Sequence, residues 1–267
     1  GEVLAMANQP SYNPNNRDGL RSEVFRNRAV TDLFEPGSTI KPFTVAAGLE
    51  SGRIKPDTVI DTWPGSFRVG KKDVKDVHPM GKLSIAGIIQ HSSNVGVIKI
   101  ALMLDQQQHW SMLDRVGFGH PSDIEIPGEV ASKLEHYKGW GATDRASLAY
   151  GYHTTISALQ LARAYGVLAS GGLLHPVTIQ KLDGKPASET RVMPEEVASQ
   201  VREMMKLVTE EGGTATAAAV EGYSVAGKTG TVKNNAGGEY EEKSYKSLFA
   251  GFLPASAPRL VGVVMID

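Results

Sequence analysis

Residues 222–231 have the sequence Gly-Tyr-Ser-Val-Ala-Gly-Lys-Thr-Gly-Thr, and this stretch decides between two folds. Positions 222–229 match the phosphate-binding loop of nucleotide-binding proteins letter for letter, and the apolar run that ends in Asp267 resembles a magnesium-binding strand. A phosphate-binding loop, however, must follow a strand and open a helix. Residues 230–238 make a poor helix and instead favour a strand that runs into a turn. We therefore expect a strand at 223–233 and reject the nucleotide-binding interpretation.

Strand patterns lie at the two ends of the chain, and helical patterns lie between them. Residues 247–253 and 260–266 follow the strand at 223–233 through turn-rich connections, which predicts an antiparallel meander. Residues 2–7 also resemble a strand, and we expect them to pair with the late strands. The expected helices span residues 38–49, 83–116, 157–168 and 194–209. The sequence thus predicts an α+β fold, with an antiparallel sheet flanked by helices and a mostly helical subdomain.

Local signals set several helix ends. Ser157 with Gln160 three residues later forms a capping box, which predicts the start of a helix. Pro194, followed by two glutamates, is typical of a first helical position. Gly117 is expected to end the helical region that precedes it.

The composition excludes several classes of protein. The 267 residues include 28 basic and 29 acidic side chains, so the formal net charge is −1. Nucleic-acid binding needs a concentrated basic patch, whereas the densest basic stretch, residues 71–76, includes two aspartates and is expected to be a solvated hairpin tip. No apolar run reaches the roughly 18 residues that span a bilayer. The chain has no cysteine, which rules out disulfides, thiolate metal sites and a cysteine nucleophile.

Three short motifs occur in order along the chain: Ser38-Thr39-Ile40-Lys41, Ser92-Ser93-Asn94 and Lys228-Thr229-Gly230-Thr231. Residues three apart share a helix face, so the Lys41 amine can lie beside the Ser38 hydroxyl. Serine is a poor nucleophile until a base removes its proton, and lysine is a base only when it is neutral. Burial and a second cation both lower the pKa of a lysine, and Lys228 is the obvious second cation. We expect Ser92 and Asn94 to complete a proton relay and to hold Lys41 in place.

The third motif is expected to line the opposite wall of a cleft. Gly230 lets the backbone approach a ligand closely. The hydroxyls of Thr229 and Thr231 can bind a ligand carboxylate, and the backbone N–H groups of Ser38 and Thr231 can form an oxyanion hole. The pattern therefore predicts acyl transfer through a serine nucleophile.

These motifs and their flanking residues resemble the class B penicillin-binding proteins, and the resemblance covers essentially the whole chain. It rests on residues 34–43 (Phe-Glu-Pro-Gly-Ser-Thr-Ile-Lys-Pro-Phe), on residues 92–97 (Ser-Ser-Asn-Val-Gly-Val) and on the Lys-Thr-Gly-Thr motif. The segments 12–16, 26–29 and 159–165 resemble the division-specific branch, penicillin-binding protein 3 of Gram-negative bacteria. His153 stands where this family usually has glycine, which puts the local loop conformation in question.

The resemblance implies a penicillin-binding, serine β-lactamase-like transpeptidase fold and a function in cell-wall synthesis. Ser38 would attack the penultimate D-alanine carbonyl of a peptidoglycan stem peptide, and an amine of a neighbouring stem would resolve the acyl-enzyme. β-Lactams would acylate the same serine, and no metal or organic cofactor is implied. By resemblance, the partners include a membrane-embedded glycan polymerase and other divisome proteins at the periplasmic face of the inner membrane. The resemblance also implies that residues 1–267 are one catalytic domain of a longer protein with a membrane anchor, a pedestal domain and a C-terminal helix.

Other interpretations remain open at this point. A D,D-carboxypeptidase, a β-lactamase-like hydrolase or a non-catalytic penicillin-sensing domain could carry the same motifs. The Glu-x-x-x-Asn match at 23–27 precedes the nucleophile instead of lying between the second and third motifs, which weakens the β-lactamase alternative. Tyr152 and Tyr245 are candidate substrate-binding residues, although core or wall packing explains any one aromatic equally well. His91 and His153 are expected to be structural or cleft-wall residues, and the sequence has no histidine pattern typical of a metal site.

Overall fold

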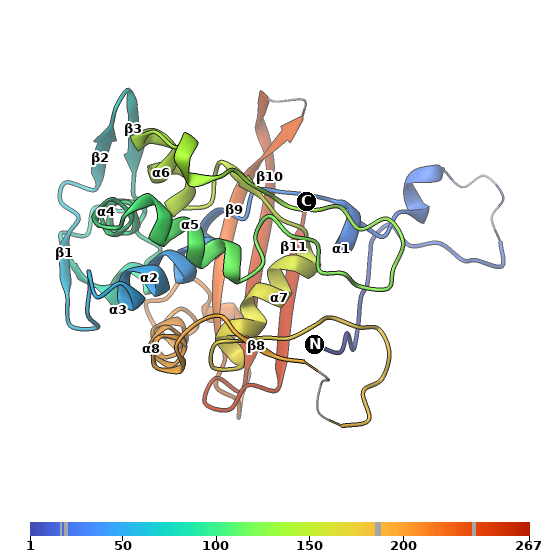
Figure 1. Ribbon diagram of the computed structural model, residues 1–267. Coiled ribbons are helices and arrows are strands. Elements are labelled where there is room, and N and C mark those ends of the chain that lie inside the picture. Colours follow the sequence, from blue (N-terminus) through green and yellow to red (C-terminus); the bar gives the residue numbers. More distant parts are fainter. Residues whose placement is uncertain (17, 19–20, 185–187, 237–238) are drawn as a thin grey trace.

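A three-stranded antiparallel sheet forms one layer of the molecule (Figure 1). The computed structural model describes residues 1–16, 18, 21–184, 188–236 and 239–267. The sheet has the order β11 (Leu260–Ile266), β10 (Glu239–Leu253), β9 (Ala226–Ala236), and both pairings are antiparallel. The predicted meander of late strands and the α+β fold class are therefore confirmed.

Helices cover one face of this sheet and continue beyond its edge (Figure 1). α7 packs on β10 and β11, and α8 packs on β9. α2 is the central helix, since it contacts α4, α5 and α8 and is buried along nearly its whole length. The helices are α1 (Arg28–Thr31), α2 (Lys41–Glu50), α3 (Ile85–Gln90), α4 (Asn94–Met103), α5 (Gln106–Arg115), α6 (Ala142–Ala149), α7 (Ala158–Ala169) and α8 (Glu195–Lys206), with 3₁₀ turns η1 (Ser22–Phe25), η2 (Gly37–Ile40), η3 (Tyr137–Gly139) and η4 (Thr216–Ala218).

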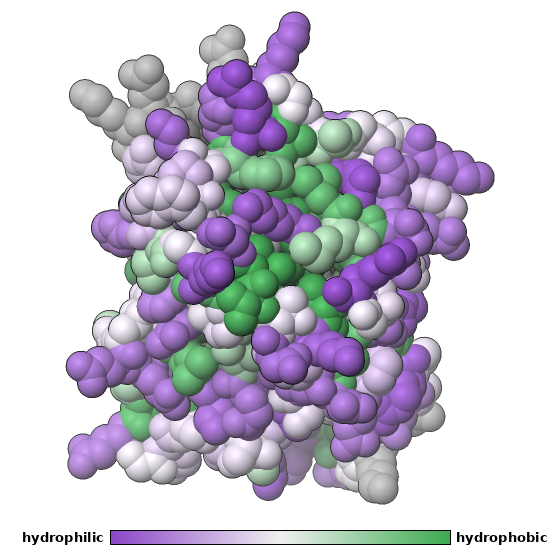
Figure 2. All heavy atoms as spheres, turned by 90° about the vertical axis from the view of Figure 1, so that its left-hand side faces the viewer, coloured by the Kyte–Doolittle hydropathy of each residue, from purple (hydrophilic) through white to green (hydrophobic). Residues whose placement is uncertain are grey.

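Short antiparallel strand pairs lie outside the three-stranded sheet. They are β1 (Val59–Asp61) with β4 (Lys82–Ser84), β2 (Ser66–Val69) with β3 (Lys72–Lys75), β5 (Lys133–Leu134) with β6 (Thr154–Thr155), and β7 (Leu173–Leu174) with β8 (Thr190–Arg191). Figure 2 views the molecule from the side on which β1 to β3 lie, where mostly hydrophilic side chains surround a patch of apolar ones. No helix in the described part of the chain is long and apolar enough to cross a membrane.

Two expected helices have the predicted local signals. The capping box at the start of α7 is confirmed, because the Ser157 hydroxyl accepts from Gln160 N and the Gln160 side chain accepts from Ser157 N. α8 begins one residue later than expected, with Pro194 as the residue before its first turn. Gly117 ends the preceding helical region with a φ of 105°, as a left-handed terminating residue does.

The helical region expected at 83–116 is three helices and not one. Ser92, with a φ of 58°, ends α3, and a capping box at Asp105 starts α5. Apolar residues continue across both breaks, so hydrophobic spacing alone does not reveal them.

The expected pairing of residues 2–7 with the late strands is wrong. Glu2 forms a parallel bridge with Thr178, and Val3 N donates to Thr178 O at 2.8 Å. Val3 and Met6 pack instead on a small apolar cluster separate from the main core, whose buried members are Val30, Ile124, Leu159 and Val177. The bridge to Thr178 and burial against this cluster, rather than pairing with the late strands, fix the start of the chain.

A glycine-to-glycine contact joins the loop after α6 to η2. Gly37 N donates to Gly151 O at 3.0 Å, and a Cβ atom on Gly151 would lie 1.9 Å from Gly37 O. Gly151 also has a φ of 93°, which L side chains rarely adopt. This contact leaves no room for any side chain at position 151.

Gly151→Ala is expected to lower the free energy of unfolding by about 2–4 kcal/mol, because steric overlap adds to an unfavourable φ. Gly52→Ala is the matched control: Gly52 has a φ of 70°, but nothing lies within 4 Å of its Cβ position. The control should lose only about 1 kcal/mol. Urea unfolding of both variants measures the difference, and equal losses would contradict the tight contact between these two segments.

Candidate active site

Ser38 lies in η2, the 3₁₀ turn that leads directly into α2. Residues i and i+3 of a 3₁₀ turn eclipse each other, so Ser38 and Lys41 occupy the same side of the junction. Pro42 follows at the start of α2, where its missing N–H costs no helical hydrogen bond. Ser38 is partly exposed, whereas Lys41 is fully buried.

Lys41 brings the first and second motifs together. Its Nζ atom donates to Ser92 O at 2.5 Å, to Ser92 Oγ at 3.1 Å and to Asn94 Oδ1 at 2.7 Å. The exposed fraction of Lys41 is 0%, so this amine has exchanged water for three protein acceptors. The predicted contact of Lys41 with Ser92 and Asn94 is present.

Ser92 occupies a strained backbone conformation between α3 and α4. Its φ is 58°, and it terminates α3 through two hydrogen bonds, from Ser92 N to Ile89 O at 3.2 Å and from Ser93 N to Ile88 O at 3.0 Å. This is the Schellman arrangement, in which glycine is the usual left-handed residue. A serine there costs conformational energy, and such strain is typical of functional positions. The left-handed turn also presents the Ser92 carbonyl oxygen to Lys41.

Asp76 holds the second motif in place and was missed by the sequence analysis. Its carboxylate accepts from Ser93 Oγ at 2.7 Å and from the backbone N–H groups of Asn94 and Val95 at the start of α4. Asn94 Nδ2 also donates to Lys75 O at 2.9 Å. The interpretation of 71–76 as a solvated hairpin tip is therefore wrong at its C-terminal end. Residues 71–73 and 75 are exposed, but Val74 is buried and Asp76 caps the first turn of α4, where a negative charge is favourable.

Lys228 is fully buried near the start of β9, the strand that packs against η2. A Cβ on Gly230 would lie 3.1 Å from Thr39 Cγ2 and 3.2 Å from Pro36 O, so glycine permits the close approach of the strand to η2. All three motifs therefore converge. Because β9 continues from Lys228 to Ala236, the structure also contradicts a phosphate-binding loop, which would open a helix directly after Lys228.

Burial lowers the pKa of both lysines of the site. Burial, and after it the positive charge of Lys228, lowers the pKa of Lys41 well below its usual value, while the charge of Asp76 opposes this. Burial lowers the pKa of Lys228 to about 7. Burial is thus the larger cause and the second cation the smaller one. The site can hold Lys41 as a neutral amine, which is the form that accepts a proton.

The threonines of the third motif differ in their surroundings. Thr229 Oγ1 and Thr214 Oγ1 lie 2.9 Å apart and share a hydrogen bond, while Thr231 is exposed. The sequence analysis missed Thr214, because the loop after α8 has no spacing signal that links it to β9. The pair offers two adjacent hydroxyls at the site.

The loop at 150–153 forms a neighbouring wall. Tyr152 is half-buried, and burial, followed by the charge of Glu35, raises its pKa; Tyr150 and Tyr245 act in the same direction. Tyr245 is 48% exposed on β10. The two predicted substrate-binding tyrosines are therefore close enough to interact electrostatically.

His153 has the left-handed backbone conformation that glycine adopts most readily. Its φ is 68°, a left-handed value that histidine tolerates better than most residues do. Its backbone N–H donates to Glu35 Oε1 at 3.3 Å, and its Nε2 lies 3.2 Å from Glu135 Oε2. The histidine thus ties this wall to the segment that precedes Ser38.

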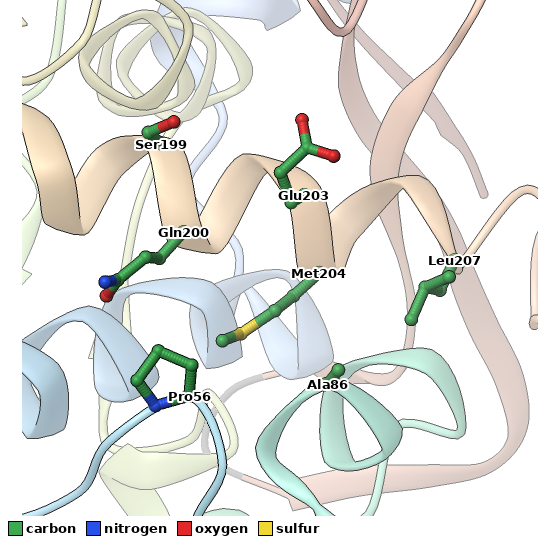
Figure 3. Close-up of a pocket in the computed structure, with 7 residues that line it drawn as sticks. All are labelled: Pro56, Ala86, Ser199, Gln200, Glu203, Met204 and Leu207. Atoms are coloured by element: carbon green, nitrogen blue, oxygen red, sulfur yellow. The ribbon is translucent and has the colours of Figure 1, made fainter.

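Other candidate features lie elsewhere. Glu23 of the Glu-x-x-x-Asn match is in η1, on a segment that extends away from the sheet and helices (Figure 1). A shallow hollow lined by α8, Pro56 and Ala86 contains no residue of the three motifs (Figure 3). In the described ranges, no group of three or more acidic or histidine side chains has a geometry suited to a metal ion.

The whole chain, residues 1–267, matches the family model of the penicillin binding protein transpeptidase domain. It is 41% identical over 267 residues to a probable peptidoglycan D,D-transpeptidase, PenA, of Neisseria flavescens, covering 100% of this chain and 66% of that protein. It is also 41% identical over 268 residues to the peptidoglycan D,D-transpeptidase FtsI of Escherichia coli, covering 100% of this chain and 45% of that protein. The chain thus spans between 45% and 66% of these two relatives.

A solved structure is similar over most of the fold. The apo transpeptidase domain of Burkholderia pseudomallei penicillin-binding protein 3 matches with a TM-score of 0.87 and 40% identity. The match covers 91% of this chain and 73% of that one. The arrangement of helices around the sheet is therefore the one found in that domain.

Charge changes around Lys41 are expected to move the pH profile of acylation in opposite directions. Lys228→Gln removes a charge that lowers the pKa of Lys41, so the acidic limb of the profile should move to higher pH. Asp76→Asn removes a charge that raises this pKa, so the limb should move to lower pH. Second-order rates of acylation by benzylpenicillin, measured across pH, report both shifts.

Thr229→Val is the control for these two variants, since it removes a hydroxyl at the same site and no charge. It should slow acylation without moving the limb. A shift in the same direction for Lys228→Gln and Asp76→Asn would contradict the assignment of Lys41 as the titrating base.

Proposed function

We propose that this chain, which belongs to the penicillin-binding protein transpeptidase domain family, catalyses peptidoglycan D,D-transpeptidation during septal wall synthesis. The family predicted from the three motifs is confirmed by the match over residues 1–267. The observation that carries the proposed activity is the fully buried Lys41 amine, bonded to both polar residues of the second motif. Lys41 follows Ser38 by three residues, at the end of the 3₁₀ turn that leads into α2.

In the proposed acylation step, Ser38 Oγ attacks the penultimate D-alanine carbonyl of a donor stem peptide. Neutral Lys41 accepts the serine proton as the new C–O bond forms. The backbone N–H groups of Ser38 and Thr231 are proposed to stabilise the oxyanion, and the approach of η2 to β9 supports their convergence. The C–N bond then breaks, and D-alanine leaves once its nitrogen is protonated.

Ser92 is proposed to deliver that proton. Its hydroxyl lies 3.1 Å from Lys41 Nζ, so a proton taken from Ser38 can pass through it to the leaving nitrogen. Asn94 Oδ1 and Ser92 O hold the amine in place during both transfers. In deacylation, an amine of a neighbouring stem attacks the ester, and the same groups return the proton to Ser38.

Lys228 and the threonines are proposed to bind the terminal carboxylate of the donor. Burial lowers the pKa of Lys228 to about 7, so this amine is desolvated. A bound carboxylate would favour its charged form and pair with it strongly. Thr229 and Thr231 supply hydroxyls, and Thr214 orients that of Thr229. Gly230 allows the ligand and η2 to approach the strand, while Tyr152 and Tyr245 are proposed to line the groove beside it.

The wider setting follows from the substrate. A D-alanyl-D-alanine stem lies outside the cytoplasmic membrane, so we place the reaction at the periplasmic face of the inner membrane. β-Lactams would acylate Ser38 because they resemble the same dipeptide end. A membrane-embedded glycan polymerase and other divisome proteins are the proposed partners, and the mechanism requires no metal or organic cofactor.

Incubation with benzylpenicillin is expected to add one drug mass to the protein, located on Ser38, because this serine is the activated nucleophile. Intact-protein and peptide mass spectrometry measure the adduct. Ser38→Ala should show none. Lys41→Arg should also show none while remaining folded, since a guanidinium stays protonated and cannot act as the base.

The same preparation distinguishes the remaining alternatives. With a D-alanyl-D-alanine peptide and an acceptor amine, a transpeptidase releases D-alanine and forms the crosslinked amide. Hydrolysis of the peptide without crosslinking would indicate a carboxypeptidase. Rapid turnover of the penicillin would indicate a β-lactamase. A penicillin adduct without release of D-alanine would indicate a sensing domain. An adduct on any residue other than Ser38 would contradict the proposed mechanism.

A further inference from the structure

The β2–β3 hairpin contacts α4, which begins with Asn94 of the second motif, and α6, which precedes the 150–153 loop. At its base, Asp76 binds the start of α4. At its tip, Lys72 Nζ donates to Ser147 Oγ of α6 at 3.2 Å. The hairpin therefore joins the second motif to the wall that contains the 150–153 loop.

The Lys72 ammonium lies on a pair of tyrosine rings. It is 5.5 Å from the ring centroid of Tyr150 and 5.7 Å from that of Tyr152, and the two rings are 5.2 Å apart. Both distances lie within the range of cation–π attraction. An exposed lysine side chain is thus held at a defined place and not left to sample solvent.

This cation is close to the nucleophile. Tyr150 and Tyr152 flank Gly151, whose carbonyl oxygen accepts from Gly37 N at 3.0 Å, and Gly37 immediately precedes Ser38. This wall therefore adjoins the segment that carries Ser38. Tyr152 also interacts with Glu35 and Tyr245, which places the lysine at the same groove as the candidate substrate-binding tyrosines.

None of the carboxylates whose side chains the structure describes lies within ion-pair distance of Lys72. The nearest acid along the hairpin, Asp73, is bound by Arg68 at 2.7 Å. Strand alternation also places Asp73 on the opposite face of β3 from Lys72. The aromatic and hydroxyl partners of the ammonium leave its charge uncompensated.

We propose that Lys72 is a specificity-determining residue that binds a carboxylate on the part of the ligand preceding its D-alanyl-D-alanine-like end. In the donor, this group is an acidic side chain next to the D-alanyl-D-alanine; in a β-lactam, it is an anionic substituent of the acyl side chain. The inference rests on the proposed function and names a substrate feature which that function leaves open. Lys72 acts in binding, and Ser38, Lys41 and Ser92 perform the chemistry without it.

Two penicillins that differ by one carboxylate test this proposal. Carbenicillin is benzylpenicillin with an added carboxylate on its side-chain carbon. In Lys72→Met, the second-order rate of acylation by carbenicillin, divided by that for benzylpenicillin, should fall about fivefold to tenfold. This is the loss expected for removal of a partly desolvated ion pair. The benzylpenicillin rate should change little, and added salt should reduce the effect in the wild-type protein.

Two further variants serve as controls. Lys72→Arg keeps the charge and should retain the wild-type ratio. Lys71→Met makes the same change of net charge in the adjoining turn and should alter the ratio less than about twofold, because an exposed charge is screened.

The outcomes separate this inference from the proposed function. An unchanged ratio in Lys72→Met, or an equal change in Lys71→Met, would overturn the role of Lys72. Failure of the wild-type protein to react with benzylpenicillin would instead contradict the proposed function itself.

Discussion

The burial of two lysines in one site is the constraint on which the rest of this structure depends. An ammonium group loses much of its hydration when it is fully buried, and a second cation nearby makes the charged form less favourable still. Lys41 and Lys228 are both fully buried, and each has a lowered pKa. A fold that tolerates this arrangement supplies a neutral base and a desolvated cation a short distance apart.

The surrounding elements reduce the free-energy cost of burying the two lysines and fix the positions of the site residues. Ser92 adopts the left-handed conformation that turns its carbonyl oxygen toward Lys41. Asp76 holds the first turn of α4, which includes Asn94, in place. Glycines at 37, 151 and 230 let η2 pack against both β9 and the 150–153 loop. The strain and the close contacts therefore occur at the places where the three motifs meet, as expected of a preorganised site.

The sequence predicted the parts of this site that depend on local spacing. Ser38 and Lys41 lie three residues apart in one turn, and the late strands alternate clearly enough to predict the meander. It did not predict Asp76 or Thr214, because their partners are 18 and 15 residues away and the contacts arise only from tertiary packing. The initial segment was assigned wrongly for a related reason: its apolar residues have a strand pattern but are buried by a side cluster. The break at Ser92 was hidden because apolar residues continue on both sides of it.

Direct titration of the Lys41 amine tests the central claim, that burial keeps this base neutral. Selective isotope labelling of the lysine side chains, with the Lys41→Arg spectrum used for assignment, allows NMR to follow the Lys41 Cε and Nζ resonances across pH. We expect Lys41 to titrate well below the usual lysine range and Lys228 to titrate near pH 7. A Lys41 amine that stays protonated up to about pH 10, as an exposed lysine does, would contradict the account.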